Sequence, residues 1–355
     1  MRFIKPSIAS LACLLASASI AQGQVTTDGN DLIIKTNGGL SVATTDGDYS
    51  MKLGGRLQWD YNQAEENGIV DEDAFDIRRA RLYVSGNVKD WGYKAQFNIG
   101  NGNGGTPEDL YIRYNGLSNG MTVTIGRQKE PFGLEQMISS KDNSMLERGG
   151  PVEAYTPGRS DGIQLNGTAG DVYYGFGVFE DEDSSGTSDF TLTGRVTSAV
   201  VNTGDSLVHL GLGYTTRGDD ISTVGLEAAY SVGPLHVQGE YFASDNAGVD
   251  LDGYYLQAGW IITGESRPYS KGVFGKVKST DVAGAWEVVV RYEAGDGDGN
   301  YSDIELGRTD ATALGVGLNW YANALTRLGI DYTTGDDENS TDTGSEFRAR
   351  VQFAF

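Results

Sequence analysis

The amino-acid sequence predicts an all-β protein: a transmembrane antiparallel β-barrel of about 16 strands with a long pore-constricting loop. Three observations lead to this prediction. Apolar residues recur at every second position, in segments of about ten residues. The links between these segments alternate between tight turns and long acidic loops. Glycine supplies 51 of 355 residues but is scattered among aromatic and aliphatic segments, unlike the composition of a disordered chain.

The N-terminus predicts a signal peptide at residues 1–21. Arg2 and Lys5 precede a short apolar core at Ile8 to Leu15, and small residues follow at the expected cleavage site. The core is too short for a retained membrane anchor, which needs about 20 apolar residues. The single cysteine lies inside this segment, so the mature chain has none. The remaining chain divides into an N-terminal periplasmic segment or short hairpin at 22–48 and a barrel at 49–355.

Alternation is clear in the first strand of the predicted barrel. Leu53 and Trp59 fall on one face, and Arg56 and Gln58 fall on the other. This is the period of a strand with two chemically different faces. Sixteen such segments follow one another, at 51–61, 76–88, 91–99, 108–116, 121–129, 160–169, 171–179, 189–200, 205–215, 222–232, 234–243, 253–262, 283–293, 310–321, 323–334 and 345–355.

The links between segments differ on the two sides of the predicted barrel. Short links such as Asp90 indicate tight turns, and acidic, Gly/Ser-rich links indicate long outer loops. Short turns on one side and long loops on the other are typical of bacterial outer-membrane barrels. The long loops are expected at Ala64–Asp73, Glu180–Asp189, Asp245–Asp252, Gly295–Asp303 and Gly335–Glu346.

Aromatic residues favour the membrane barrel over a soluble β-sandwich. They recur near strand ends, as at Trp91 and Trp320, where interfacial girdles are expected. The last segment places Phe347, Phe353 and Phe355 on one face and ends on an aromatic residue, like the C-terminal assembly signal of such barrels. The predicted location is the bacterial outer membrane, where the chain would contact lipid and lipopolysaccharide.

Composition disfavours catalysis and nucleic-acid binding. The formal charge is −22, whereas phosphate backbones require a cationic surface. Two histidines leave few candidates for a catalytic triad or a metal site, and we expect no enzyme activity, no cofactor and no bound metal. Gly100, Gly102 and Gly105 match a dinucleotide fingerprint in letters, but a strand follows where a helix is required. An outer-membrane barrel enzyme or an adhesin remains the rival from another functional class.

Many basic residues take the inward phase of their strands, whereas the acids crowd into the loops. The lumen is therefore expected to be locally positive despite the acidic total. The alternative is that these cations pair with lumen acids such as Glu227 and Glu287 and brace the wall. The inward set is Arg56, Arg79, Arg81, Lys94, Arg113, Arg195, Arg291, Arg327, Arg348 and Arg350. Arg78 is out of phase with Arg79 and marks either a bulge or a strand end.

Two stretches without alternation are expected to fold inward. The stretch from Glu130 to Arg159 is too long for an idle connection and carries Lys141 and Arg148. Folded into the lumen, it would narrow the pore; the alternative is an extracellular lid. Gly264–Lys278 is the second such stretch and carries Lys271 and Lys276.

These residues also resemble a known family, the phosphate-selective porins O and P. The resemblance covers essentially the whole mature chain and is most specific from Gly126 to Arg148. It implies a sixteen-stranded trimeric barrel whose third loop enters the pore. It also implies that Arg78 and Arg79 are positions of an arginine ladder, and that Lys141, with Lys271 and Lys276, supplies constriction lysines. The motifs are LGGRLQ at 53–58, FDIRRAR at 75–81, DWGY at 90–93, GRQKEPFGLE at 126–135, SSK at 139–141, MLER at 145–148, TGESRPY at 263–269 and GVFGKV at 272–277.

The sequence therefore predicts a passive outer-membrane channel for small hydrophilic solutes. Inorganic phosphate or another small anion is the expected permeant, and a homotrimer is the expected assembly. The alternative within this class is a general diffusion pore with a weak cation preference set by its acidic mouth. Arginines at alternate positions form two short pairs, Arg79-x-Arg81 and Arg348-x-Arg350, and not a long ladder on one strand. The sequence therefore does not specify the natural solute. The candidate pore-lining and anion-binding residues are Arg78, Arg79, Arg81, Arg56, Arg113, Lys141, Arg148, Lys271 and Lys276.

Overall fold

The computed structural model describes residues 31–36, 38–100, 105–182, 188–218, 220–279, 282–297, 311–337 and 343–355. The predicted signal peptide at 1–21 lies outside the described residues, as does the first part of the segment at 22–48. Within the described ranges no helix is long and apolar enough to cross a membrane.

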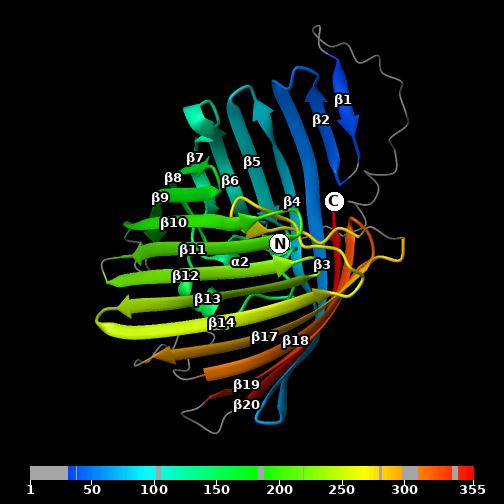
Figure 1. The fold of residues 1–355 in the computed structure, drawn as a ribbon, viewed down its shortest axis with the longest axis vertical. Helices are drawn as coiled ribbons and strands as arrows, with labels where there is room; N and C mark the ends of the chain where they lie inside the picture. The colour runs from blue at the N-terminus through cyan, green and yellow to red at the C-terminus, as the bar shows by residue number, and fades with distance from the viewer. Residues whose placement is uncertain are drawn as a thin grey trace, which may run out of the picture.

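Sixteen antiparallel strands of the described chain form a closed barrel (Figure 1). Each strand pairs with its neighbour in the chain, and β20 returns to pair with β3. The strands are β3 (Tyr49–Glu66), β4 (Ile69–Val88), β5 (Trp91–Asn98), β6 (Thr106–Tyr114), β7 (Thr122–Lys129), β8 (Arg159–Ala169), β9 (Val172–Glu182), β10 (Ser188–Asn202), β11 (Ser206–Arg217), β12 (Ile221–Val232), β13 (Leu235–Asn246), β14 (Val249–Ile261), β17 (Ala285–Gly297), β18 (Ala311–Tyr321), β19 (Thr326–Asp337) and β20 (Thr343–Ala354). The predicted fold class is confirmed.

The closing seam between β3 and β20 joins the two ends of the barrel. Eleven residue pairs form its register, from Gly344 opposite Glu66 to Ala354 opposite Arg56. The backbone of Phe355 then exchanges two hydrogen bonds with Gly55. Because the seam is closed, the barrel presents no open edge to lipid.

Alternation along the strands separates a lipid face from a lumen face. On β12, Val224, Leu226 and Tyr230 are exposed outward, whereas Thr223 and Glu227 are buried inward. Stacked Trp286 and Trp320 lie at one end of the barrel, with ring centroids 5.7 Å apart, and the Trp91–Tyr114 pair lies at the same end. This placement agrees with an aromatic girdle at the membrane interface.

A short hairpin extends the wall beside the start of β3. It consists of β1 (Leu32–Lys35) and β2 (Leu40–Thr44), and β2 pairs with residues 50–53 of β3. Beyond the barrel strands, the chain forms the short elements η1 (Ser118–Gly120), α2 (Leu134–Met137), α3 (Gly150–Tyr155), β15 (Tyr269–Ser270) and β16 (Val273–Phe274).

Two of the predicted long loops are wrong. Where Ala64–Asp73 was expected to be a loop, β3 and β4 continue to a two-residue turn at Asn67 and Gly68, both with positive φ. Where Asp245–Asp252 was expected, β13 and β14 meet at a similar turn at Ala247 and Gly248. Residues 69–78 of β4 are exposed throughout, so both faces of this extension tolerate charge and the alternation disappears. Part of Gly295–Asp303 also continues β17, and the rest lies outside the described residues.

Candidate functional site

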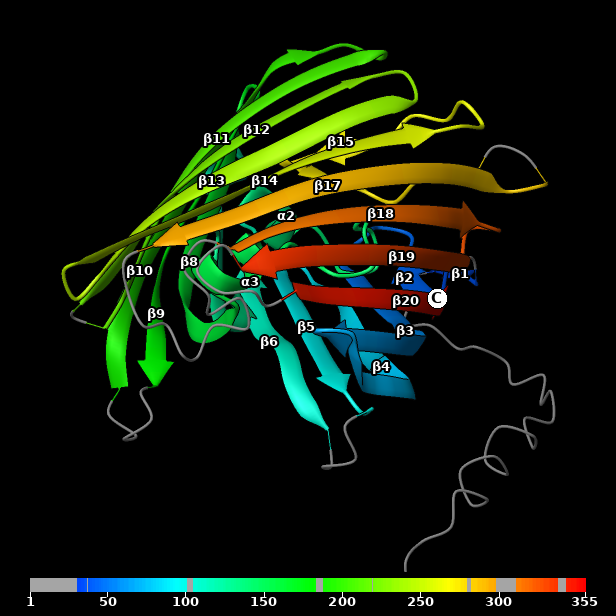
Figure 2. The ribbon, with the colours of Figure 1, turned by 90° about the horizontal axis from the view of Figure 1, so that it is seen from below.

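The segment between β7 and β8 folds into the lumen and carries α2 and α3, as Figure 2 shows inside the ring of strands. Gly133 has a φ of +71° and turns the chain into α2. The first N–H groups of α2 point at the opposite wall, where those of Leu134 and Glu135 donate to the Glu240 carboxylate at 2.5 and 2.9 Å. A carboxylate at a helix N-terminus satisfies donors that would otherwise be unpaired. The predicted pore-constricting loop is confirmed.

Arginines of β19 and β20 hold this loop through hydrogen bonds to its backbone. Arg327 donates to the carbonyls of Asn143 and Ser144 at 2.6 and 2.7 Å, and Arg350 donates to that of Leu146 at 2.6 Å. Charged donors to buried carbonyls give strong hydrogen bonds. Arg291 and Arg195 are also engaged, with Glu293 at 2.5 Å and Glu227 at 2.7 Å. On this side of the lumen, the inward arginines therefore brace the wall and anchor the loop.

A second inserted segment, between β14 and β17, enters from the other end of the barrel. Arg195 donates to the Gly272 carbonyl at 2.8 Å, and the Tyr269 hydroxyl lies 2.5 Å from His209 Nδ1. Arg267 reaches the Asp142 carbonyl at 2.8 Å, which joins the two inserted segments. Leu134, Ile138 and Phe274 pack together between them with wall residues. The half of the lumen beside β10–β20 is thus largely filled.

The other half of the lumen holds a cavity of about 700 Å³, between the inserted segments and strands β3–β9. Among the described residues, eleven basic side chains line it and one acidic side chain, that of Asp109. The eleven are Lys52, Arg56, Arg79, Arg81, Lys94, Arg113, Lys129, Lys141, Arg148, Arg159 and Lys271.

The structure brings most of the predicted site residues to this cavity. Seven of the nine line it: Arg56, Arg79, Arg81, Arg113, Lys141, Arg148 and Lys271. The other two are Arg78, which lies at the edge of the loop, and Lys276, whose ammonium group donates to the Ala324 carbonyl. Burial lowers the pKa of Lys276, helped by the neighbouring charge of Lys141.

A β-bulge explains the phase of Arg78. The register slips between Gln58 and Asp60 of β3, so that β4 contains one extra residue beside Arg78. Both Arg78 and Arg79 then reach the Glu147 carboxylate. The sequence left open whether Arg78 marks a bulge or a strand end, and this register agrees with the bulge.

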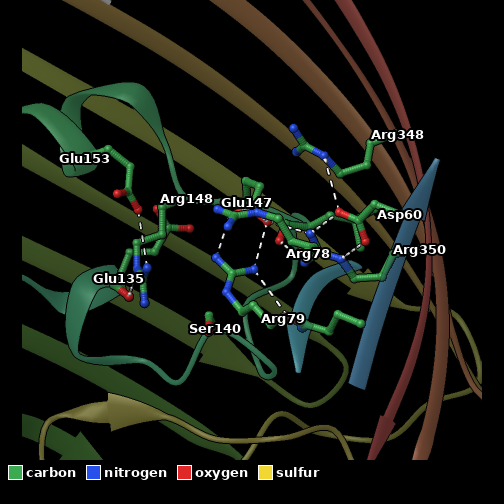
Figure 3. A network of polar contacts seen from close by, with 12 residues as sticks. Asp60, Arg78, Arg79, Glu135, Ser140, Glu147, Arg148, Glu153, Arg348 and Arg350 are labelled. Atoms are coloured by element: carbon green, nitrogen blue, oxygen red, sulfur yellow. Dashed lines mark hydrogen bonds and ion pairs between the residues drawn. The ribbon is translucent and has the colours of Figure 1, made fainter. Parts of the chain in front are cut away.

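Glu147 contacts three members of an arginine cluster, which we define as Arg78, Arg79, Arg348 and Arg350 (Figure 3). Arg348 and Arg350 also contact Asp60, at 3.8 and 2.5 Å. Burial opposes ionisation of Glu147, but the hydrogen bond and charge of Arg79 and the charges of its neighbours outweigh it and hold the pKa of Glu147 well below its ordinary value. The cluster has four positive groups, and three acids contact it: Glu147, Asp60 and Glu346.

Two acidic side chains of β6, Glu108 and Asp109, lie between cations of β4, β5 and β8. Arg159 contacts Glu108 at 3.0 Å and Asp109 at 2.6 Å, and each acid also contacts a second cation, Arg81 or Lys94. Arg56 instead donates to the Ser140 hydroxyl at 2.9 Å, so this guanidinium brings uncompensated charge to the wall. In the described part of the chain, Lys52 and Lys271 have no ion-pair partner.

Four of the eleven basic lining residues were missing from the predicted set. Lys52 and Lys94 have the inward phase of their strands, so the alternation alone already indicated that they belong among the pore-lining residues. Arg159 and Lys129 lie where the loop meets β8 and β7, and a break in alternation conceals their orientation. Lys129 donates to the carbonyls of Gln136 and Ile138, so it positions α2 as well as lining the cavity.

A smaller cavity of about 340 Å³ continues the first toward the short-turn end. The two share Lys52, Ser85, Tyr111, Arg113 and Asn115, and the smaller one also borders the β1–β2 hairpin. Arg113 lies over the Tyr111 ring at 5.0 Å, which fixes its charge at the junction. Among the described residues, no group of three or more histidine, cysteine, aspartate or glutamate side chains could hold a metal ion.

Comparison with known proteins agrees with this geometry. The family model described as phosphate-selective porin O and P matches residues 51–220 and 203–355. Porin O of Pseudomonas aeruginosa is 32% identical to the chain, and the alignment covers 98% of each protein.

Solved structures show the same barrel architecture at low identity. An anion-selective porin from Comamonas acidovorans has a TM-score of 0.63 and 17% identity, with 86% of this chain and 100% of that chain covered. OmpT of Vibrio cholerae, in its in-vitro folded trimer form, has a TM-score of 0.59 and 14% identity, with 86% and 99% covered. At such identities the likeness extends to the fold alone.

Proposed function

Because the chain belongs to the phosphate-selective porin O and P family, we propose that its basic cavity conducts small anions, inorganic phosphate among them, through the bacterial outer membrane. The protein is a passive outer-membrane channel and not an enzyme.

The observation that carries the proposal is the sign of the charge along the open half of the lumen. Of the residues that the structure describes, eleven basic and one acidic side chains line the cavity, although the whole chain carries a formal charge of −22. Guanidinium and ammonium groups replace part of the hydration shell of an anion, and several moderate sites in series allow the ion both to enter and to leave. A cation in the same cavity would meet repulsion at short range.

The proposed route runs from the long-loop mouth to the short-turn end. An anion would pass the arginine cluster, enter the cavity beside Arg56 and Ser140, and leave past Arg113 and Lys52 into the smaller cavity. Phosphate specificity is supported by the family and by the hydroxyl and guanidinium donors at Ser140 and Arg56, which suit an oxyanion.

Planar-bilayer recordings across a potassium chloride gradient test the proposal. We expect a reversal potential of the sign given by an anion-selective pore, and a fall in chloride current when phosphate is added. A cation-selective reversal potential that phosphate leaves unchanged would refute it and would favour the general diffusion pore with an acidic mouth.

We also propose a homotrimer in contact with outer-membrane lipid and lipopolysaccharide. One structural relative is described in a trimer form, and the outward faces of the strands carry exposed aliphatic and aromatic side chains. Crosslinking of the unmodified protein in outer-membrane vesicles would give a three-subunit band; a band of one subunit only would contradict the trimer.

A further inference from the structure

Three guanidinium groups surround the Glu147 carboxylate with five N–H donors. Arg78 donates through Nε and Nη2 at 3.1 Å each, and Arg79 donates through both Nη atoms at 2.9 Å each. Arg350 donates through Nη2 at 2.5 Å. All three arginines come from the barrel wall, whereas Glu147 belongs to the inserted loop (Figure 3).

These donors are more than one carboxylate needs. Glu147 offers two oxygens and one negative charge, against three positive groups that approach it together. Asp60 takes part of the charge of Arg350 and Arg348, and Glu346 contacts Arg348, so the cluster still has one more positive than negative group. An oxyanion with two charges and more oxygens would match this set of donors better.

The side chain of Glu147 can leave the arginines while the loop stays docked. The neighbouring backbone has its own anchors: the Leu146 N–H donates to Asp331 at 2.9 Å, and the Leu146 carbonyl accepts from Arg350 at 2.6 Å. The Glu147 carbonyl accepts from Arg291 at 3.0 Å. Solvent already reaches the site, because the Glu147 and Arg78 side chains are 19% and 43% exposed.

We propose that Glu147 is a tethered competitor of the permeant anion: it occupies an oxyanion site formed by Arg78, Arg79 and Arg350, and a doubly charged oxyanion displaces it. This inference rests on the proposed anion route and adds a selection step at its entrance. Chloride carries one charge and has no oxygen atoms with which to accept several hydrogen bonds in a fixed geometry, so it competes poorly with the carboxylate. The tethered group therefore sets the affinity for dianions and prevents the arginines from trapping them.

The test compares the unmodified channel with Glu147→Gln and with Glu153→Gln as the matched control. Glu153 lies in the same loop and its side chain is 58% exposed, so the control removes one carboxylate from this loop without emptying the arginine site. The quantity measured is the phosphate concentration that halves the chloride conductance in planar bilayers. We expect Glu147→Gln to lower it about tenfold, and Glu153→Gln to change it less than about twofold.

An equal or higher half-blocking concentration in Glu147→Gln overturns the inference, since the carboxylate would then be a brace and not a competitor. An equal shift in both variants also overturns it, because general charge removal would explain the result. The absence of any phosphate block in the unmodified channel overturns the proposed function itself, and with it this step.

Glu147→Asp covers the case in which Glu147→Gln does not assemble. Aspartate keeps the charge but withdraws the carboxylate by one methylene, so we expect a smaller fall in the same concentration. An unchanged or raised value in Glu147→Asp overturns the inference.

Discussion

Replacement of Arg327 by Met tests how firmly the pore-constricting loop is held. Arg327 is 2% exposed and donates to the carbonyls of Asn143 and Ser144, which are themselves buried. A hydrogen bond from a charged donor contributes about 1.5–3 kcal/mol, so the two bonds together contribute about 3 kcal/mol or more to docking. A loss of about 3 kcal/mol raises the undocked fraction of the loop by about two orders of magnitude.

Two assays report on the undocked loop. Single-channel recordings of Arg327→Met are expected to show frequent excursions to a larger conductance, because an undocked loop no longer fills the lumen. Trypsin is expected to cut after Lys141 or Arg148 faster than in the unmodified protein. Arg348→Met is the matched control: it removes a lumen arginine from the next strand, and the contacts of that arginine are to Asn62, Glu346 and Asp60 and not to the loop.

Unchanged channel noise and unchanged proteolysis in Arg327→Met would refute this reasoning. The docking free energy would then reside in the remaining contacts, chiefly those of Glu240 and Arg350. A change of the same size in Arg348→Met would also refute it, since lumen charge and not loop anchoring would be responsible.

Three further predictions concern Lys141, Glu147 and Gly126. Lys141→Glu is expected to shift the reversal potential toward cations, because Lys141 lines the basic cavity; an unchanged potential would place it outside the conduction route. The pKa of Glu147 lies well below its ordinary value of 4.5, so its stabilisation is complete above pH 4.5 and is lost only as the pH falls toward the lower folded value. The anion selectivity of the channel should therefore be constant from about pH 7 to pH 5 and rise in stronger acid, where a neutral Glu147 leaves the arginines uncompensated; a rise already near pH 5 would contradict the shift. Gly126→Ala is expected to destabilise the barrel by about 1–3 kcal/mol, measured as a lower temperature of heat unfolding in detergent, because Gly126 has a φ of +118° and an added Cβ would lie 2.4 Å from the Leu110 carbonyl oxygen. An unfolding temperature equal to that of the unmodified protein would contradict it.

The strands could be predicted from the sequence because each barrel strand faces lipid on one side and the lumen on the other. Where both sides are wet, as along residues 69–78, the alternation disappears and strand was mistaken for loop. The charge of the open half could also be predicted, since Arg56, Arg81 and Arg113 follow the strand period.

Which lumen arginines anchor the loop and which line the cavity could not be predicted. Arg327 and Arg56 have the same inward phase, yet one anchors a loop and the other lines the cavity. The difference depends on where the loop docks, which is decided by contacts between residues 143 and 327 that no local pattern encodes. The bulge at Arg78 likewise depends on the register with β3 and not on the sequence of β4 alone.

The seam between β3 and β20 has a consequence for the order of folding. Every other pairing between the described barrel strands joins strands adjacent along the chain, whereas the seam joins β20 to β3, and its Arg350–Asp60 pair joins residues 290 positions apart. Closing so long a segment gives this contact a large entropic barrier, so it is expected to form after the local hairpins. Until the C-terminal strand arrives, β3 exposes unpaired backbone and Asp60 lacks the guanidinium group of Arg350. Barrel closure and completion of the arginine cluster are therefore one event, and a chain shortened at its C-terminus would lose the seal against lipid and the charge of the entrance together.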